Sequence, residues 1–257
     1  MFDAHLHIID PRFPLVANQG YRPEPFTVAD YRARVAGLGV TGGAVVAGSY
    51  QGYATDYLVT ALRELGEGFV GVAQVPPDVP DARLYELHTA GVRALRFNLR
   101  RRVGSGDTDT AADIDGLVEL GERAARLLGW PAEFYVDARE LPALAPRIAA
   151  LPRVSVDHLG LSAEGLPALL DLVAAGARVK ATGFGRVDMD VASALRSIAA
   201  VDRGALMFGT DLPSTRAARP FQPADRDLVV RALGAEVAED VLAANARVFY
   251  GIDAADT

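Results

Sequence analysis

The chain has 257 residues, 50% of them hydrophobic and 23% charged, with a formal net charge of −7, which is a globular composition without the basic footprint of a nucleic-acid-binding protein. The absence of cysteine excludes disulfide scaffolds, cysteine zinc sites and thiol catalysis. No apolar run approaches the roughly 18 residues that span a bilayer, and no secretory signal is visible, so we expect a cytoplasmic protein with no membrane partner.

Short apolar runs alternate along the chain with longer amphipathic segments. We expect strands at Phe2–Ile8, Gly43–Ala47, Phe69–Val75, Val92–Asn98, Glu133–Val136, Val154–Asp157, Arg178–Thr182 and Leu206–Thr210. We expect helices at Val28–Leu38, Asp56–Leu65, Ala82–Ala90, Ile114–Leu128, Leu141–Leu151, Leu166–Ala175, Val191–Val201 and Ala235–Phe249. This alternation predicts a parallel sheet covered on its outside, and eight strands favour an α/β fold with a single (β/α)8 TIM barrel over residues 1–257.

Three long irregular segments follow strands and precede helices, so in a barrel each would lie on the catalytic face. They are Ile9–Phe26, Arg100–Ala111 and Pro213–Pro223. Thr27 and Asp30, at the end of the first of these segments, resemble a capping box and predict a helix that begins near Val28.

The most informative motif is Asp3-Ala4-His5-Leu6-His7 at the end of the first strand. Alternate side chains of a strand share a face, so His5 and His7 are expected to point into the barrel with Asp3 behind them. Two imidazoles with this spacing can converge on one metal ion. The structural alternative is a pair of hydrogen-bonded core histidines.

Two further motifs end the sixth and eighth strands, namely Asp157-His158-Leu159-Gly160 and Gly209-Thr210-Asp211-Leu212-Pro213. The carboxyl ends of barrel strands meet at one mouth, so His5, His7, His158 and Asp211 are expected to gather there. Asp157 is interpreted either as an acceptor that supports these residues or as a buried structural carboxylate.

These motifs resemble the amidohydrolase superfamily, in its amidohydrolase-2 branch of barrel-fold hydrolases. The resemblance covers nearly the whole chain and is carried by Asp3–His7, Val28–Arg32, Leu87–Leu99, Asp157–Gly160, Gly209–Pro213 and Asn245–Gly251. Within the branch, the Arg-Phe-Asn of the fourth strand and the Asp-His-Leu-Gly of the sixth are similar to the lactonases that act on 2-pyrone-4,6-dicarboxylate and on sugar lactones.

The sequence departs from the binuclear members of the superfamily, which carry a bridging lysine on the fourth strand. Arg96 and Asn98 stand there instead, and the chain's only lysine, Lys180, lies on the seventh strand. The resemblance therefore implies one divalent metal, zinc in the first place, held by His5, His7 and Asp211, with His158 as a further ligand or as a polariser of the substrate carbonyl. Some relatives of this type work without metal, so a metal-independent site stays open.

The expected activity is hydrolysis of a cyclic ester that carries a carboxylate. Asp211 is the expected general base, and His158 is expected to polarise the carbonyl or hold the oxyanion. Arginine forks suit carboxylates, and the candidate substrate-binding residues are Arg96, Arg102, Arg186, Tyr21, Tyr50 and Ser49. The alternative for Arg100–Arg102 is a solvated charged loop, and the tyrosines can equally be packing residues.

Two other functions are weighed against the lactonase. Related barrels use one zinc for nonoxidative decarboxylation of small aromatic or unsaturated acids, but they typically add a histidine on the fifth strand, which is absent from Glu133–Val136. A barrel that binds a small acid without catalysis is the third hypothesis. The expected partner in all three is a small, anionic molecule, and a homo-oligomer stays open.

Overall fold

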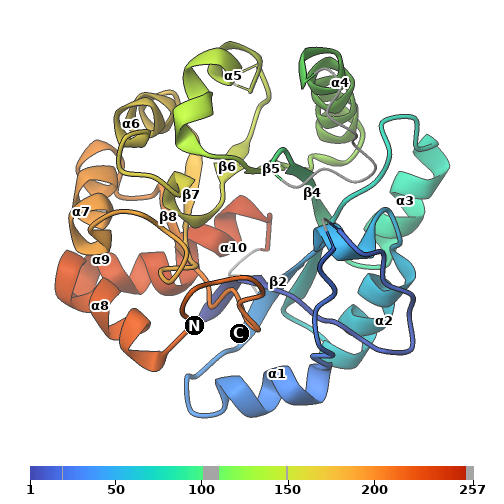
Figure 1. Ribbon diagram of the computed structural model, residues 1–257, viewed down its shortest axis with the longest axis horizontal. Coiled ribbons are helices and arrows are strands. Elements are labelled where there is room, and N and C mark those ends of the chain that lie inside the picture. Colours follow the sequence, from blue (N-terminus) through green and yellow to red (C-terminus); the bar gives the residue numbers. More distant parts are fainter. Residues whose placement is uncertain (19, 101–109, 149, 253–257) are drawn as a thin grey trace.

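The computed structural model describes residues 1–18, 20–100, 110–148 and 150–252. Over these residues, eight strands form one sheet, in which neighbours are parallel and follow the order of the sequence. The strands are β1 (Phe2–Leu6), β2 (Gly42–Val46), β3 (Phe69–Ala73), β4 (Val92–Asn98), β5 (Ala132–Tyr135), β6 (Val154–Val156), β7 (Arg178–Ala181) and β8 (Leu206–Phe208). Figure 1 shows them inside a ring of helices.

The sheet closes between its first and last strands just beyond β8. The Asp211 N–H donates to the His5 carbonyl over 2.7 Å, and the His7 N–H donates to the Leu212 carbonyl over 2.8 Å. The same two hydrogen bonds bring the end of β1 beside the end of β8. The predicted TIM barrel is therefore confirmed.

Most of the helices lie on the outside of the barrel, as the alternating pattern predicts, whereas α10 lies behind the strands near the centre of Figure 1. The helices are α1 (Val28–Val35), α2 (Asp56–Leu65), α3 (Asp81–Thr89), α4 (Thr110–Leu128), α5 (Leu141–Ile148), α6 (Leu166–Ala174), α7 (Val191–Val201), α8 (Pro223–Leu233), α9 (Ala235–Glu239) and α10 (Asn245–Phe249). The predicted capping box is present, since the Thr27 hydroxyl and the Asp30 carboxylate each bond the other residue's backbone N–H.

Helix α8 is absent from the sequence-based prediction. Its sequence begins Pro-Ala-Asp-Arg-Asp, and its buried residues in the structure are only Asp225 and Val229, so it has little apolar periodicity to detect. Its start is fixed instead by Pro223 in the first turn and by the Asp225 carboxylate, which accepts the Gln222 N–H over 3.0 Å. The predicted last helix, Ala235–Phe249, is interrupted by a π-helical turn at Asp240–Ala244.

A second correction concerns Asp3. The register of β1 against β2 shifts between Asp3 and Leu6, so the simple alternation of faces fails there. The Asp3 carboxylate accepts hydrogen bonds from the Tyr31 hydroxyl of α1 at 3.0 Å and from the Thr210 hydroxyl at 2.7 Å. Asp3 therefore joins β1 to the helix layer and to the turn after β8, and does not stand behind the two histidines.

Two apolar clusters hold the fold. The larger lies between strands and helices, and the smaller fills the barrel at the amino ends of the strands. In the smaller cluster the Tyr250 ring, at the end of α10, packs against Phe2 with the ring centres 5.9 Å apart. Burying one such large side chain contributes about 1.5–3 kcal/mol. The barrel is thus closed by apolar packing at one end, which leaves the carboxyl ends of the strands for polar residues.

Candidate active site

Three histidines and an aspartate meet at the carboxyl ends of three strands. His5 and His7 come from β1 and its end, His158 follows β6, and Asp211 follows β8. The Nε2 atoms of His5, His7 and His158 lie 3.9, 3.7 and 4.0 Å from Asp211 Oδ1. All four side chains are buried. The structure therefore gathers around one carboxylate oxygen the four residues that the sequence singles out.

The backbone at two of these residues is strained. His158 has φ +51° and Asp211 has φ +58°, and neither is glycine. Such left-handed conformations cost about 1–3 kcal/mol each and concentrate at functional sites. At Asp211 the surrounding structure holds the conformation, since its N–H is bonded to the His5 carbonyl. The strain turns both side chains toward the mouth of the barrel.

Each histidine fixes its ring through a second contact. His7 Nδ1 lies 2.7 Å from the Val46 carbonyl, which can only accept, so the proton is on Nδ1 and Nε2 keeps its lone pair. His158 Nδ1 lies 2.7 Å from the Thr182 hydroxyl, which can accept or donate. His5 Nδ1 lies 3.4 Å from Lys180 Nζ and 3.5 Å from the Asp157 carboxylate. A ring held through Nδ1 in this way presents Nε2 to the site.

The four side chains fit a divalent cation. Two overlapping groups, His5 with His7 and Asp211, and His5 with Asp157 and His158, have potential ligand atoms within 4.8 Å of one another. His5 Nε2 and Asp211 Oδ1 have no hydrogen-bond partner among the residues that the structure describes, although both are buried. Imidazole nitrogen and carboxylate oxygen are common zinc ligands, so the orphaned atoms suit such an ion.

The charges of the site follow from burial and from one arginine. Burial lowers the pKa of all three histidines, that of His158 to about 3, so the imidazoles are neutral. Burial alone would raise the pKa of Asp211, but Arg186 and the histidines lower it far below its ordinary value. Arg186 Nε and Nη2 bind Asp211 Oδ2 at 2.7 and 2.5 Å. Asp211 is therefore an ionised carboxylate, with Oδ1 facing the histidines.

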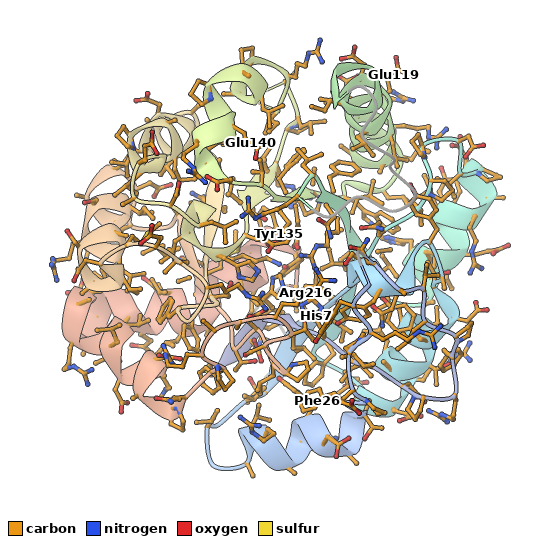
Figure 2. The ribbon with its side chains drawn as sticks, viewed as in Figure 1. His7, Phe26, Glu119, Tyr135, Glu140 and Arg216 are labelled. Carbon is orange, nitrogen blue, oxygen red and sulfur yellow. The ribbon has the colours of Figure 1, made fainter. Side chains whose placement is uncertain are left out.

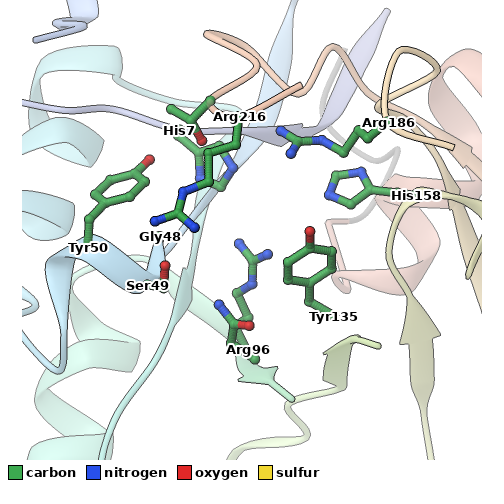
Figure 3. Close-up of a pocket in the computed structure, with 11 residues that line it drawn as sticks. His7, Gly48, Ser49, Tyr50, Arg96, Tyr135, His158, Arg186 and Arg216 are labelled. Atoms are coloured by element: carbon green, nitrogen blue, oxygen red, sulfur yellow. The ribbon is translucent and has the colours of Figure 1, made fainter. Parts of the chain in front are cut away.

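A pocket opens directly above these residues (Figure 3). It encloses about 390 Å³ of space when its open mouth is included. Its lining residues are His7, Gly48, Ser49, Tyr50, Arg96, Asn98, Tyr135, His158, Arg186, Thr215 and Arg216. Figure 2 places His7, Tyr135 and Arg216 near the middle of the ring of helices, as expected for the mouth of a barrel.

Four of the six candidate substrate-binding residues line this pocket, namely Ser49, Tyr50, Arg96 and Arg186. Tyr21 lies against the pocket residue Arg216, whose guanidinium carbon is 4.3 Å from the centre of the Tyr21 ring. Arg102 lies outside the described residues.

Arg96 is buried inside the barrel, and its charge is compensated there. One guanidinium nitrogen donates to the Ala47 carbonyl over 2.7 Å, and the other lies 3.3 Å from Asp157 Oδ2. The guanidinium carbon is 5.4 Å from the centre of the Tyr135 ring. Asp157 thus both supports His5 and neutralises Arg96, which combines the two interpretations that the sequence leaves open.

Sequence reasoning does not identify Tyr135, Thr215 or Arg216 as pocket residues. Tyr135 could have been found, because it lies two positions after Glu133 on β5 and shares its inward face. Thr215 and Arg216 lie in the loop after β8, where no periodicity assigns a direction. A wider cleft adjoins the pocket and shares Tyr135, Arg186 and Arg216 with it. Arg100, which pairs with Asp137 at 3.4 Å, lines this outer cleft.

Comparison with known proteins agrees with the fold and with the family that the sequence resembles. A family model described as amidohydrolase matches residues 2–252. The 2-pyrone-4,6-dicarboxylate hydrolase of Comamonas testosteroni is 36% identical over 161 residues, which are 62% of this chain and about half (51%) of that protein. The 4-sulfomuconolactone hydrolase of Rhizobium radiobacter is 28% identical over 253 residues, 89% of this chain and 81% of that protein.

Solved structures share the architecture. A crystal structure from Acinetobacter baumannii with citric acid bound superimposes with a TM-score of 0.78 at 18% identity, covering 97% of this chain and 98% of the other. At this identity the likeness shows a common barrel. Within the described residues, no helix combines the length and the apolar character that a membrane span requires.

Proposed function

The chain belongs to the amidohydrolase family, and from that premise we propose that it hydrolyses the ester bond of a lactone that carries a carboxylate. The observation that carries the proposal is the environment of Asp211. One oxygen is fixed by Arg186, and the other, Oδ1, faces three imidazole nitrogens beside a pocket lined by arginines. The relatives named as hydrolases of a pyrone dicarboxylate and a sulfomuconolactone support both the bond type and the anionic substrate.

The residues that would hold a divalent metal are His5, His7 and Asp211, and His158 would serve either as a further ligand or as a polariser of the substrate carbonyl. When bound there, such an ion, with zinc as the best match to these ligands, lowers the pKa of water and polarises a carbonyl. The neutral imidazoles leave their nitrogen lone pairs available for this purpose.

Hydrolysis needs a base that receives the proton of water and returns it to the leaving alkoxide. Asp211 is suited to this role, because Arg186 keeps it ionised and orients Oδ1 toward the pocket side of the histidines. His158 lies across from Asp211 with its Nε2 4.0 Å from Oδ1. When the Thr182 hydroxyl donates to Nδ1, His158 carries its proton on Nε2 and can donate it to the oxyanion of the tetrahedral intermediate.

The substrate carboxylate would be bound by the arginines of the pocket. Arg96 and Arg186 each use part of their donor set on a buried carboxylate and present the remainder to the cavity. Ser49 and Tyr50 supply hydroxyl groups on the side of the pocket across from Arg186, where Figure 3 shows them. Arg102 and Tyr21 remain proposed substrate contacts.

A panel of lactones with and without a carboxylate, followed by acid release, tests this proposal. We expect turnover of carboxylated lactones and a loss of at least about 100-fold in kcat for Asp211→Asn. Asp225→Asn is the matched control, because Asp225 is also a buried carboxylate paired with an arginine but belongs to α8. Release of carbon dioxide from aromatic acids without lactone turnover would favour the decarboxylase. Acid binding without turnover of either class would favour a binding barrel.

A further inference from the structure

A buried ion pair lies inside the barrel beneath the candidate active site, and no step of the proposed hydrolysis uses it. Lys180 of β7 and Glu133 of β5 are both fully buried. Lys180 Nζ donates to Glu133 Oε2 over 2.5 Å. On the other oxygen, Glu133 accepts the Tyr250 hydroxyl over 2.5 Å. The pair therefore stands between the closed end of the barrel and the histidines at its mouth.

The pair also touches the active site. Lys180 Nζ lies 3.4 Å from His5 Nδ1 and 3.8 Å from Asp157 Oδ1. Asp157 Oδ1 itself lies 3.5 Å from the same His5 nitrogen. His5 Nδ1 thus has two neighbours of opposite charge at nearly equal distance.

These two neighbours favour opposite tautomers of His5. A lysine ammonium can only donate, so a hydrogen bond from Lys180 requires a lone pair on Nδ1 and places the proton on Nε2. A carboxylate can only accept, so a hydrogen bond to Asp157 requires the proton on Nδ1 and leaves the Nε2 lone pair facing Asp211. Only the second tautomer allows Nε2 to bind a metal ion.

The position of Glu133 favours one of these two tautomers of His5. Its carboxylate is much closer to Lys180 than His5 is, at 2.5 Å against 3.4 Å, and it carries a full negative charge that the neutral imidazole lacks, so its attraction for the ammonium is the stronger of the two. Tyr250 holds Glu133 in place from the opposite side. We propose that Glu133 is a positioning residue that draws Lys180 away from His5, so that Asp157 receives the Nδ1 proton and Nε2 remains a ligand. The tautomer of His5 does not depend on the proposed function, whereas the effect of that tautomer on catalysis rests on it.

The alternative is a salt bridge that serves the fold alone. Removing either partner of a buried pair leaves an uncompensated charge, so both single variants are expected to lose stability in either case. The tautomer separates the two explanations. Loss of Glu133 frees Lys180 to donate to His5, whereas loss of Lys180 leaves Asp157 as the nearest partner of Nδ1.

The experiment records long-range proton–nitrogen NMR correlations of the histidine rings in the metal-free protein, because the pattern of these correlations differs between the two tautomers. The signals of His5 are assigned as those that disappear in His5→Gln. Wild type and Lys180→Met are expected to carry the proton on Nδ1. Glu133→Gln, which offers one neutral acceptor that Tyr250 also contacts, is expected to shift it to Nε2. The double variant Glu133→Gln/Lys180→Met is expected to return it to Nδ1. Arg178→Gln, on the same strand but paired with Asp202, is the control.

Titration with Zn²⁺ against a competing chelator gives a second readout. We expect Glu133→Gln to weaken Zn²⁺ binding about 10–100-fold and the double variant to recover most of that loss. A wild-type His5 protonated on Nε2, or an unchanged tautomer in Glu133→Gln, overturns the proposal. If Glu133→Gln does not fold, Glu133→Asp withdraws the carboxylate while keeping its charge and is expected to shift part of the population to Nε2. Because no substrate is involved, these outcomes are independent of whether the protein opens lactones.

Discussion

Replacing Arg186 by methionine tests the central electrostatic feature of the site. Arg186 makes two charge-assisted hydrogen bonds to Asp211 Oδ2, and the Asp211 carboxylate has no exposure to solvent. Hydrogen bonds to charged groups contribute about 1.5–3 kcal/mol each, and breaking a buried pair by removing one partner costs about 3–5 kcal/mol. If about 3 kcal/mol of this positions Asp211 for the reaction, kcat/KM falls roughly 100-fold, because about 1.4 kcal/mol corresponds to a factor of ten.

The assay combines turnover of a carboxylated lactone with denaturant unfolding of Arg186→Met and of Arg219→Met. Arg219 also binds a buried aspartate through two nitrogens, one to each oxygen of Asp225 at 2.7 and 3.0 Å, but it is more exposed and lies outside the pocket described above. We expect Arg219→Met to lose about 1 kcal/mol or less and to keep its activity. The double variant Arg186→Met/Asp211→Asn is expected to regain stability without activity. Activity of Arg186→Met within about threefold of wild type would refute the assignment of this ion pair to the chemistry.

Three further outcomes are expected. Arg139 holds the pKa of Asp137 down to about 2, so the stability that Asp137 provides is present near neutral pH and is lost as pH falls from about 4 to 2. In Asp137→Asn, the free energy of unfolding measured with urea should vary less across that interval, by up to about 2 kcal/mol. Zn²⁺ at about 100 times its Kd should stabilise the chelator-treated protein by about 2.7 kcal/mol, and thermal unfolding of Asp211→Asn should show little of this gain. Gly48→Ala should raise KM several-fold with a smaller change in kcat, because the new methyl carbon would lie 2.4 Å from the Tyr50 ring and would displace that ring from the pocket wall. An unchanged KM would exclude Tyr50 from substrate binding.

Most of the barrel was predictable because its strands are buried on both faces. Segments such as Gly42–Val46 therefore appear in the sequence as short apolar runs, whether a residue faces the inner or the outer cluster. Helix α8 was not predicted because its first turn is polar and its apolar residues, Val229 apart, are only partly buried against the core. The shifted register of β1 was not predicted, because a bulge does not change the alternation of residue types in the sequence. It is seen only in the strand pairing and in the hydrogen bonds of Asp3.

The residues that carry the chemistry of the site could be predicted from the sequence, but most of the contacts between them could not. His5, His7, His158 and Asp211 lie at strand ends, where the barrel itself determines their meeting place. The hydrogen-bond and ion-pair partners of these residues could not be predicted in the same way. Arg186 could be proposed as a substrate contact, but its bond to Asp211 depends on the path of two loops. The Lys180–Glu133 pair joins two strands that are separated in the sheet by β6, and no local pattern predicts such a pairing across the barrel.

The buried charges of the barrel constrain what the site can bind. Among the described residues, three cation–carboxylate contacts span its interior, from Lys180 to Glu133, from Arg96 to Asp157 and from Arg186 to Asp211. With neutral histidines these three contacts sum to no net charge, and Arg216 brings a further guanidinium group to the pocket. A carboxylated lactone would carry a negative charge into this cavity, where burial without a partner is costly, so we expect its carboxylate to lie against the guanidinium groups of the pocket. A divalent cation at Asp211 would add positive charge beside the histidines and would give the orphaned His5 Nε2 a partner.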